Sequence, residues 1–244
     1  MHIFLVWACV LGAFGNNAFA QEVLTIGVEN KDWYSHYIWQ GNTLVGLDPD
    51  LVRTVAGQMG YEVVFEPYPW GRVIRMAEDK ALDGVLDLAL VQEREKYLHY
   101  VRTPITTEQT TFWVKKGKKV PFAGKFRPDL RLGLIRGADW TDRFAKMGTP
   151  TVKRFNTFEL AFQNLVAGRI DIFASYLAPT LYHARRLGYL DRIESHAYTQ
   201  PDMPYYLAFS DKPGHAELAR KFNEKLQEFL SSPDYQTLKG KYDF

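Results

Sequence analysis

Within residues 23–91, segments with the hydrophobic pattern of a strand alternate with segments that have the pattern of an amphipathic helix. Apolar side chains within 47–60 recur at intervals of three and four residues, as on one face of a helix: Leu51, Val52, Val55, Ala56 and Met59. Apolar runs at 23–30, 61–69 and 84–91 predict strands, and 70–81 predicts a second helix. This β-α-β-α-β order is typical of a parallel sheet with helices on its faces.

The ends of the first predicted helix carry capping signals. We expect Asp48 at the N-cap and Pro49 at the first helical position, where a missing N–H group costs nothing. Gly60 suits the left-handed conformation that follows the last turn. These signals place the helix within 47–60.

The same order of elements recurs in the second half of the chain. Strands are predicted at 129–137, 151–155 and 169–175, with helices in 139–148 and up to Gly168. The segments "ALDGVLDLAL" (81–90) and "AGRIDIFASY" (167–176) therefore occupy equivalent places. Two half-size α/β lobes follow, each with a mostly parallel sheet flanked by helices.

Two segments with a proline-marked bend and a β-rich run, 103–117 and 199–212, are expected to join the lobes. Residues 215–244 have an amphipathic helical pattern and are expected to pack back on the first lobe. Lobe 1 would then comprise 21–108 and 203–244, and lobe 2 would comprise 109–202. The chain would cross between them twice, which gives a two-stranded hinge.

The N-terminus has the pattern of an export signal. Residues 1–20 contain an apolar run that ends in Ala18-Phe19-Ala20, which predicts a cleaved signal peptide and a periplasmic protein. The alternative, a lipid anchor at Cys9, is disfavoured because the apolar run continues to Phe14. Cys9 is the only cysteine, so the mature chain would form no disulfide.

Charge and motif content narrow the function. The chain has 30 Lys and Arg against 28 Asp and Glu, a balance that argues against a nucleic-acid partner. The six histidines lack metal-ligand spacing, and no G-x-S-x-G, P-loop or H-E-x-x-H motif occurs. We therefore expect a monomer without metal or cofactor, and not an enzyme.

The stretch "DGVLDLALVQEREKY" (83–97) places an acid, Asp87, inside a buried strand and an arginine, Arg94, beyond its end. Ligands of open α/β sheets bind at the carboxyl ends of the strands. A guanidinium there could hold a carboxylate with two parallel hydrogen bonds. The alternative is a surface arginine that pairs with Glu93, Glu95 or a helix end.

Four segments in order, 44–100, "LGLIRGADW" (132–140), "AGRIDIFAS" (167–175) and "YYLAFSDK" (205–212), resemble the bacterial extracellular solute-binding proteins of family 3. The resemblance implies a type II periplasmic-binding-protein fold that closes on a small carboxylate-bearing solute, an amino acid or similar compound. It also implies delivery of this solute to the permease of an ABC importer. Two alternatives stay open, a soluble sensory protein and a dehydratase-like enzyme of the same fold.

The resemblance also implies a set of ligand-binding residues. Arg94 would bind the carboxylate, and the cleft would be lined by Glu29, Trp33 and Trp70. Apart from the resemblance, Arg136, Asp139 and Trp140 are candidates because they lie where a strand end opens a helix, whose backbone N–H groups can bind an anion. Asp87 and Tyr176 complete the candidate set. Tyr176 or Ser175 falls where the family has an aspartate for the ligand's ammonium group. Asp87, Glu29 or Asp139 would have to replace this charge, or the ligand is an acid without an amine. The same three acids are the candidates for a general acid in the enzyme alternative.

Overall fold

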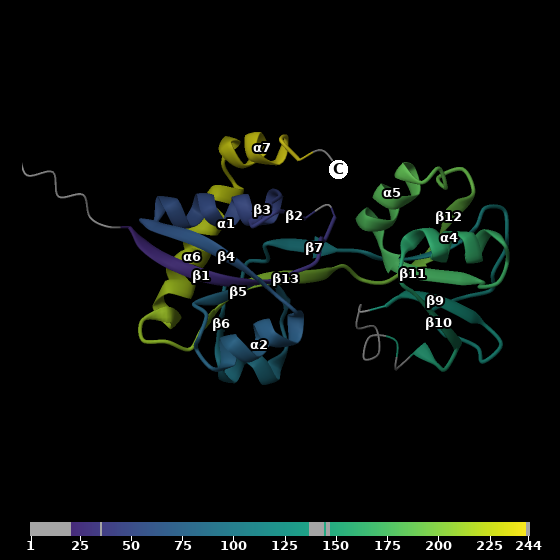
Figure 1. The fold of residues 1–244 in the computed structure, drawn as a ribbon, viewed down its shortest axis with the longest axis horizontal. Coiled ribbons are helices and arrows are strands. Elements are labelled where there is room, and N and C mark those ends of the chain that lie inside the picture. Colours follow the sequence, from purple (N-terminus) through teal and green to yellow (C-terminus); the bar gives the residue numbers. More distant parts are fainter. Residues whose placement is uncertain (1–20, 35, 137–143, 145–146, 243–244) are drawn as a thin grey trace, which may run out of the picture.

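The chain folds into two α/β lobes that lie side by side (Figure 1). A computed structural model describes residues 21–34, 36–136, 144 and 147–242. The expected signal peptide and most of the helix expected within 139–148 lie outside these residues. In the described part of the chain, no helix has both the length and the apolar character needed to cross a membrane.

The first sheet has six strands, in the order β4-β1-β5-β13-β6, and β7 also pairs with β13. β1 is parallel to β4 and β5, whereas β13 is antiparallel to β5, β6 and β7, so β13 alone runs in the opposite direction. The strands are β1 (Glu22–Glu29), β4 (Tyr61–Tyr68), β5 (Gly84–Ala89), β6 (Leu98–Tyr100), β7 (Thr106–Glu108) and β13 (Met203–Ser210).

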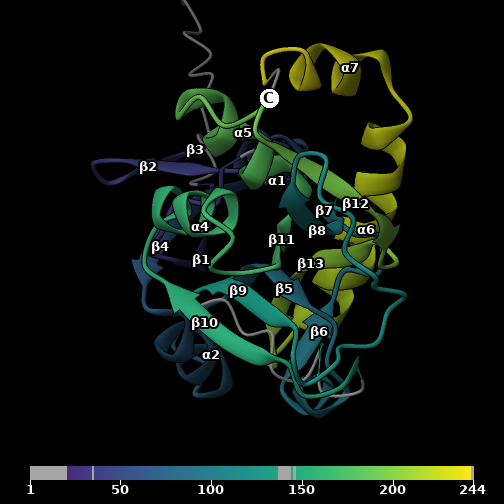
Figure 2. The same cartoon turned by 90° about the vertical axis from the view of Figure 1, so that its right-hand side faces the viewer.

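Helices cover both faces of this sheet. One face packs against α1 (Leu47–Gln58), α6 (His215–Leu230) and α7 (Pro233–Lys239), and the other packs against α2 (Trp70–Glu78). Figures 1 and 2 accordingly show α7 and α2 on opposite sides of the sheet. The C-terminal amphipathic segment is thus two helices on the first lobe. A small hairpin, β2 (Ile38–Gln40) and β3 (Thr43–Val45), precedes α1.

The second sheet has five strands, in the order β10-β9-β11-β8-β12. Only β8 runs against the others, because it is antiparallel to both β11 and β12 while β9 is parallel to β10 and β11. Helices α4 (Phe158–Val166) and α5 (Leu177–Arg186) cover one face. The strands are β8 (Thr110–Lys115), β9 (Arg131–Ile135), β10 (Thr151–Phe155), β11 (Ile172–Tyr176) and β12 (Ile193–Thr199).

In both lobes the same pair of hydrogen bonds joins the start of the third strand of the repeat (β5 or β11) to the first strand (β1 or β9). The Thr25 N–H donates to the Asp83 carboxylate at 2.8 Å, and the Asp83 N–H donates to the Thr25 carbonyl at 2.8 Å. In the second lobe, Asp171 makes the same two bonds with the backbone of Arg131, at 3.1 and 2.8 Å. Asp83 and Asp171 therefore hold β5 and β11 against their neighbouring strands through equivalent hydrogen bonds.

Each first strand has a glycine two residues after the residue that makes these bonds: Gly27 after Thr25 in β1, and Gly133 after Arg131 in β9. A Cβ atom on Gly27 would lie 2.5 Å from Cδ1 of Leu82, and one on Gly133 would lie 2.4 Å from Cδ1 of Ile170. Real Cβ atoms do not approach so closely, so a larger residue at either site would have to displace the buried side chain of Leu82 or Ile170. The two lobes therefore share these packing contacts, as well as the order of strands and helices that the sequence predicted.

The chain passes between the sheets twice. β7 ends at Glu108 in the first sheet and β8 begins at Thr110 in the second, and the return runs from Thr199 of β12 to Met203 of β13. The single reversed strand of each sheet is the strand that the chain enters on crossing. The lobe boundaries at 108/109 and 202/203 stay a prediction, which this sheet membership supports.

Candidate functional site

Arg94 and Trp70 are brought together beyond the end of β5. Trp70 is the first residue of α2, and Arg94 lies on the short 3-10 helix Gln92–Lys96. The guanidinium carbon of Arg94 lies 5.9 Å from the centre of the Trp70 ring, a cation–π distance. Glu95 pairs with Arg102 at 2.8 Å, so the surface pairing considered for Arg94 is not made with this acid.

The Arg94 side chain turns back on its own strand end. Its Nη1 lies 3.4 Å from the carbonyl oxygen of Ala89, which also accepts a bond from the Tyr100 hydroxyl at 3.1 Å. A distance of 3.4 Å is long for a hydrogen bond. The guanidinium is thus half-buried and only weakly bonded to this carbonyl.

Trp33 and Tyr176 also meet, and they do so across the junction of the lobes. Their rings lie 5.8 Å apart, and Tyr205 of β13 completes the group, with its ring 4.8 Å from that of Trp33. The hydroxyls of Tyr176 and Tyr205 are 2.6 Å apart. We call Trp33, Tyr176 and Tyr205 the aromatic wall. Tyr176 comes from the second sheet and Tyr205 from the first, so the contacts within the aromatic wall connect the two lobes.

A second aromatic contact joins the lobes beside the wall. Tyr34 stacks on Tyr182 of α5, with ring centres 4.5 Å apart and an interplanar angle of 15°. Stacked and edge-to-face aromatic pairs stabilise a contact beyond the area that they bury. The contact between the lobes is therefore made in part by aromatic side chains of both lobes.

Asp87 lies at an irregularity in β5. Its φ of 54° is in the left-handed region, and the pairing of β5 with β13 shifts register beside it. Leu86 packs on the α1 face of the sheet and Leu88 on the α2 face, although residues two apart in a regular strand share a face. Asp87 is thus the extra residue of a β-bulge.

Asp87 belongs to a buried cluster with His36, Asp48 and Glu108, which we call the acid–histidine cluster. The four residues are at most 7% exposed. Nδ1 of His36 lies 2.9 Å from the Asp48 carboxylate, and Nε2 contacts the Glu108 carboxylate. No N–H or O–H donor in the described part of the chain reaches the Asp87 carboxyl. The charged groups that act on it are Asp48, His36 and Glu108.

The protonation of this cluster follows from its contacts. Burial alone would lower the pKa of His36, but the hydrogen bonds to Asp48 and Glu108 outweigh it and raise the pKa to about 10. Burial raises the pKa of Asp87 well above its usual value, and the charges of Asp48 and Glu108 add to this effect. We therefore describe His36 as protonated and Asp87 as resisting ionisation.

The cluster corrects the sequence interpretation of α1. The helix has Gly46 at its N-cap, so the predictions that put Asp48 at the N-cap and Pro49 at the first helical position are both wrong. The Asp48 side chain is instead buried inside the first turn and pairs with His36. Gly60 has the expected positive φ, 87°.

The remaining candidate residues are not gathered around Arg94. Glu29 pairs with Lys31 at 3.2 Å, and its carbonyl accepts from the Trp39 indole at 2.9 Å. Arg136 is exposed and donates to the side chain of Asn156 at 3.0 Å. Asp139 and Trp140 lie outside the described residues. The ligand roles of all nine candidates stay predictions.

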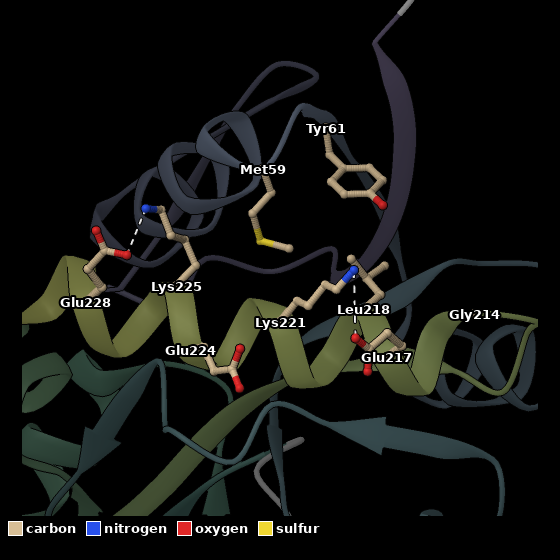
Figure 3. A pocket seen from close by; sticks show the side chains of 9 residues that line it. All are labelled: Met59, Tyr61, Gly214, Glu217, Leu218, Lys221, Glu224, Lys225 and Glu228. Carbon is tan, nitrogen blue, oxygen red and sulfur yellow. Dashed lines mark hydrogen bonds and ion pairs between the residues drawn. The ribbon is translucent and has the colours of Figure 1, made fainter.

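Two hollows lie elsewhere on the surface. One, of about 540 Å³, runs along α6, where Met59 and Tyr61 face the paired charges of Glu217 and Lys221 (Figure 3). The other, of about 480 Å³, lies beside the hinge and takes its lining from both lobes, including Glu108 and Leu177. None of the seven candidate residues that the structure describes lines either hollow.

Sequence reasoning missed His36, Glu108 and Tyr205. His36 was one of six histidines without metal-ligand spacing, and its partner Glu108 is 72 residues away along the chain. Tyr205 lay in the "YYLAFSDK" segment, but no pattern in one sequence pairs it with Tyr176. These contacts depend on tertiary structure alone.

Two α/β lobes joined by two chain crossings define a type II periplasmic-binding-protein fold, as the sequence predicted. An ancestral arginine-binding protein bound to arginine has the same fold, with a TM-score of 0.69 and 24% identity, over 91% of this chain and 98% of that one. The model of the bacterial extracellular solute-binding proteins, family 3, matches residues 24–244. The chain belongs to this family.

Curated relatives are amino-acid-binding proteins by name. The ABC transporter arginine-binding protein 1 of Escherichia coli (strain K12) is 25% identical in an alignment of 250 positions that covers 98% of each chain. The L-cystine-binding protein TcyJ of Escherichia coli (strain K12) is 20% identical, over 90% of this chain and 82% of the relative. The family is thus one of solute-binding proteins, and its relatives differ in their ligands.

Proposed function

We propose that this protein binds a small carboxylate-bearing solute, an amino acid or similar compound, and delivers it to the permease of an ABC importer. The observation that carries the proposal is Arg94, a half-buried guanidinium at the carboxyl end of a parallel strand. A carboxylate there would gain charge-assisted hydrogen bonds in place of the long bond to the Ala89 carbonyl. The names of the curated relatives support the transport role.

Lobe closure would couple binding to delivery. A ligand shifts the equilibrium between open and closed lobes only if it binds one state better than the other. Arg94 belongs to the first lobe and Tyr176 to the second, so a solute that touches both favours closure. The permease would then recognise the closed form.

The proposal also includes the location, the oligomeric state and the membrane partner of the protein. Residues 1–20 would direct export to the periplasm and be cleaved, and the mature chain would act as a monomer. Residues 21–108 with 203–244 would move as one lobe and 109–202 as the other. The ABC permease would be the membrane partner.

The enzyme alternative has one observation in its favour, the raised pKa of Asp87. A general acid must also reach the atom that it protonates. Each carboxyl oxygen of Asp87 is enclosed, with less than 1 Å² of accessible surface. We therefore propose binding without catalysis.

The proposal is tested on ligand-stripped, refolded mature protein. A thermal-shift panel of amino acids, carboxylic acids, amines and aromatic acids would identify ligands, because a ligand at about 100 times its Kd adds about 2.7 kcal/mol. For a chain of this size the midpoint would rise by roughly 5–10 °C. Silence across all acids would contradict the proposal.

For each ligand found, Arg94→Ala should weaken binding by about 2–4 kcal/mol, which is about 30- to 700-fold, through loss of the charge-assisted pair. Calorimetric titration measures this loss. The matched control is Arg102→Ala, since Arg102 is 63% exposed and pairs with Glu95 on the surface. Wild-type affinity in Arg94→Ala would remove Arg94 from the site.

A further inference from the structure

The parts of the chain that build the two lobes differ strongly in charge. Residues 109–202 contain 16 Lys and Arg against 8 Asp and Glu, a net charge of +8. Residues 21–108 and 203–244 together contain 14 Lys and Arg against 20 Asp and Glu, a net charge of −6. Residues 137–146, most of which lie outside the described part, contribute two bases and two acids and do not change this balance. Charge asymmetry of this size points to an anionic partner for the basic part.

Many of the bases lie at the end of the second sheet that is farthest from the first lobe. β11 ends at Tyr176, which contacts the first lobe, so the amino ends of β9, β11 and β12 lie at the outer end. β8 runs the other way and ends there at Lys115. Figure 1 shows the connection from β8 to β9, in teal, at this outer end. We call the segments 115–131, 169–171 and 191–194 the basic pole.

Direct contacts join the three segments of the basic pole. The N–H of Lys116 donates to the carbonyl of Arg192 at 3.0 Å. The Asp171 carboxylate accepts from Lys118 at 2.7 Å and from the Arg131 guanidinium at 2.7 and 2.8 Å. The bases therefore share one surface.

The acids of the basic pole neutralise only part of its charge. The pole contains nine Lys and Arg and four acids, which are Asp129, Asp171, Asp191 and Glu194. Asp171 pairs with Lys118 and Arg131, and Asp129 pairs with Arg127. The other six bases are exposed and form no ion pair with a described residue: Lys115, Lys116, Lys119, Lys125, Arg169 and Arg192.

The exposed surface of the basic pole is charged without being apolar. None of the large apolar side chains that are exposed in the described part of the chain belongs to it, and Phe122 and Phe126 are buried. A protein–protein interface has an apolar or aromatic centre, and a single-stranded nucleic acid stacks its bases on exposed rings. A lipid surface requires neither, because its anionic headgroups attract clustered bases through charge alone.

We propose that the basic pole binds an anionic lipid surface through the phosphate groups of the lipids. The acidic first lobe is repelled by the same surface, so the protein binds with its second lobe toward the membrane. This contact would hold the protein at the membrane that contains the permease of the proposed function. The inference goes beyond that function, because the basic pole lies at the other end of the lobe from Tyr176.

Vesicle sedimentation of the mature protein tests the proposal. Vesicles of phosphatidylglycerol and phosphatidylcholine in equal parts are the anionic probe, and vesicles of phosphatidylcholine alone are the neutral one. At about 0.1 M salt, where the Debye length is about 10 Å, we expect binding to the anionic vesicles to be at least about tenfold tighter. At about 1 M salt the Debye length is about 3 Å, and binding should be lost.

A triple variant tests the location of the lipid-binding surface. Lys115→Gln, Lys116→Gln and Lys119→Gln together remove three unpaired charges and should weaken binding to the anionic vesicles at least about tenfold. The matched control has three substitutions by glutamine at exposed bases of the first lobe, Arg75, Lys239 and Lys241. The control should change binding by less than about twofold, because charges far from the surface are screened. Both variants should keep the wild-type thermal midpoint, since all six side chains are exposed.

Each outcome supports or overturns the proposal. Equal binding to both kinds of vesicle, or binding to neither, overturns it. No loss in the triple variant, or an equal loss in the control, overturns the location of the surface. Tighter binding to a short DNA duplex than to the anionic vesicles at the same salt would identify a nucleic-acid site instead.

The ligand panel is a separate readout. The triple variant should bind every solute with wild-type affinity, because the basic pole is remote from Arg94 and from the junction of the lobes. Failure to bind vesicles would leave the proposed function intact, and a silent ligand panel would leave the vesicle result unchanged.

Discussion

Glu108→Gln should weaken the protein at low pH and much less at high pH, because it removes one of the two charges that hold His36 protonated. The variant keeps an oxygen that can accept a bond from Nε2 of His36. A hydrogen bond between charged groups contributes about 1.5–3 kcal/mol, so the pKa of His36 should fall from about 10 by roughly 1–2 units. The same amount of unfolding free energy should be lost at pH 6.

The direction of the pH effect follows from linkage. A histidine whose folded pKa is about 10 and whose usual pKa is 6.5 stabilises the fold fully below pH 6.5. This stabilisation falls as the pH rises from 6.5 towards 10. In the variant the fall ends at a lower pH, about 8–9, so the difference between the two proteins should stay constant up to about pH 8 and then shrink towards pH 10 at up to about 1.4 kcal/mol per unit.

Urea unfolding of both proteins at each pH from 6 to 10 measures this difference. NMR titration of the His36 ring measures its pKa directly. A difference that stays constant from pH 6 to pH 10 would refute the reasoning. A His36 ring that titrates near 6.5 in the wild-type protein would refute it as well.

Two further predictions concern the repeated packing of the lobes. Gly27→Ala and Gly133→Ala should each destabilise the protein by about 1–3 kcal/mol in urea unfolding, because the added Cβ overlaps Leu82 or Ile170. Gly57→Ala in α1 is the control, since nothing lies within 4 Å of its Cβ, and it should stabilise by about 0.5–1 kcal/mol. Asp171→Asn should cost about 1–3 kcal/mol at pH 7 through its bonds to Arg131 and Lys118. Because these partners lower the pKa of Asp171 below its usual range, the cost should diminish as the pH falls below about 4.

The hydrophobic pattern was sufficient to predict most of the regular structure. All five apolar residues of the α1 face pack in the core, and β4 and β10 begin at their predicted residues. The strand expected at 84–91 ends at Ala89, two residues after the bulge at Asp87. A bulge depends on a neighbouring strand that is distant in sequence, so the local pattern contains no signal for it.

The candidate site was less predictable, because its contacts join residues that are distant in sequence. Asp48 has a side chain typical of an N-cap, and local preference places it there. Its tertiary partner His36 draws the carboxylate into the core instead, and this contact has no local signature. Conversely, the sequence placed Arg94 at a strand end and the family resemblance singled out Trp70, and the structure brings the two within cation–π distance.

The internal repeat explains why the scaffold was easier to predict than the site. If Asp83 is aligned with Asp171, Asp87 corresponds to Ser175, and both are 4% exposed. Backbone bonds to the two aspartates, together with the glycines of β1 and β9, fix the first half of each third strand in the same way. Beyond this point the repeats diverge: β5 leads to Arg94 on a 3-10 helix, whereas β11 ends in Tyr176 at the start of α5. Because no shared packing constrains these ends, they can differ between the lobes.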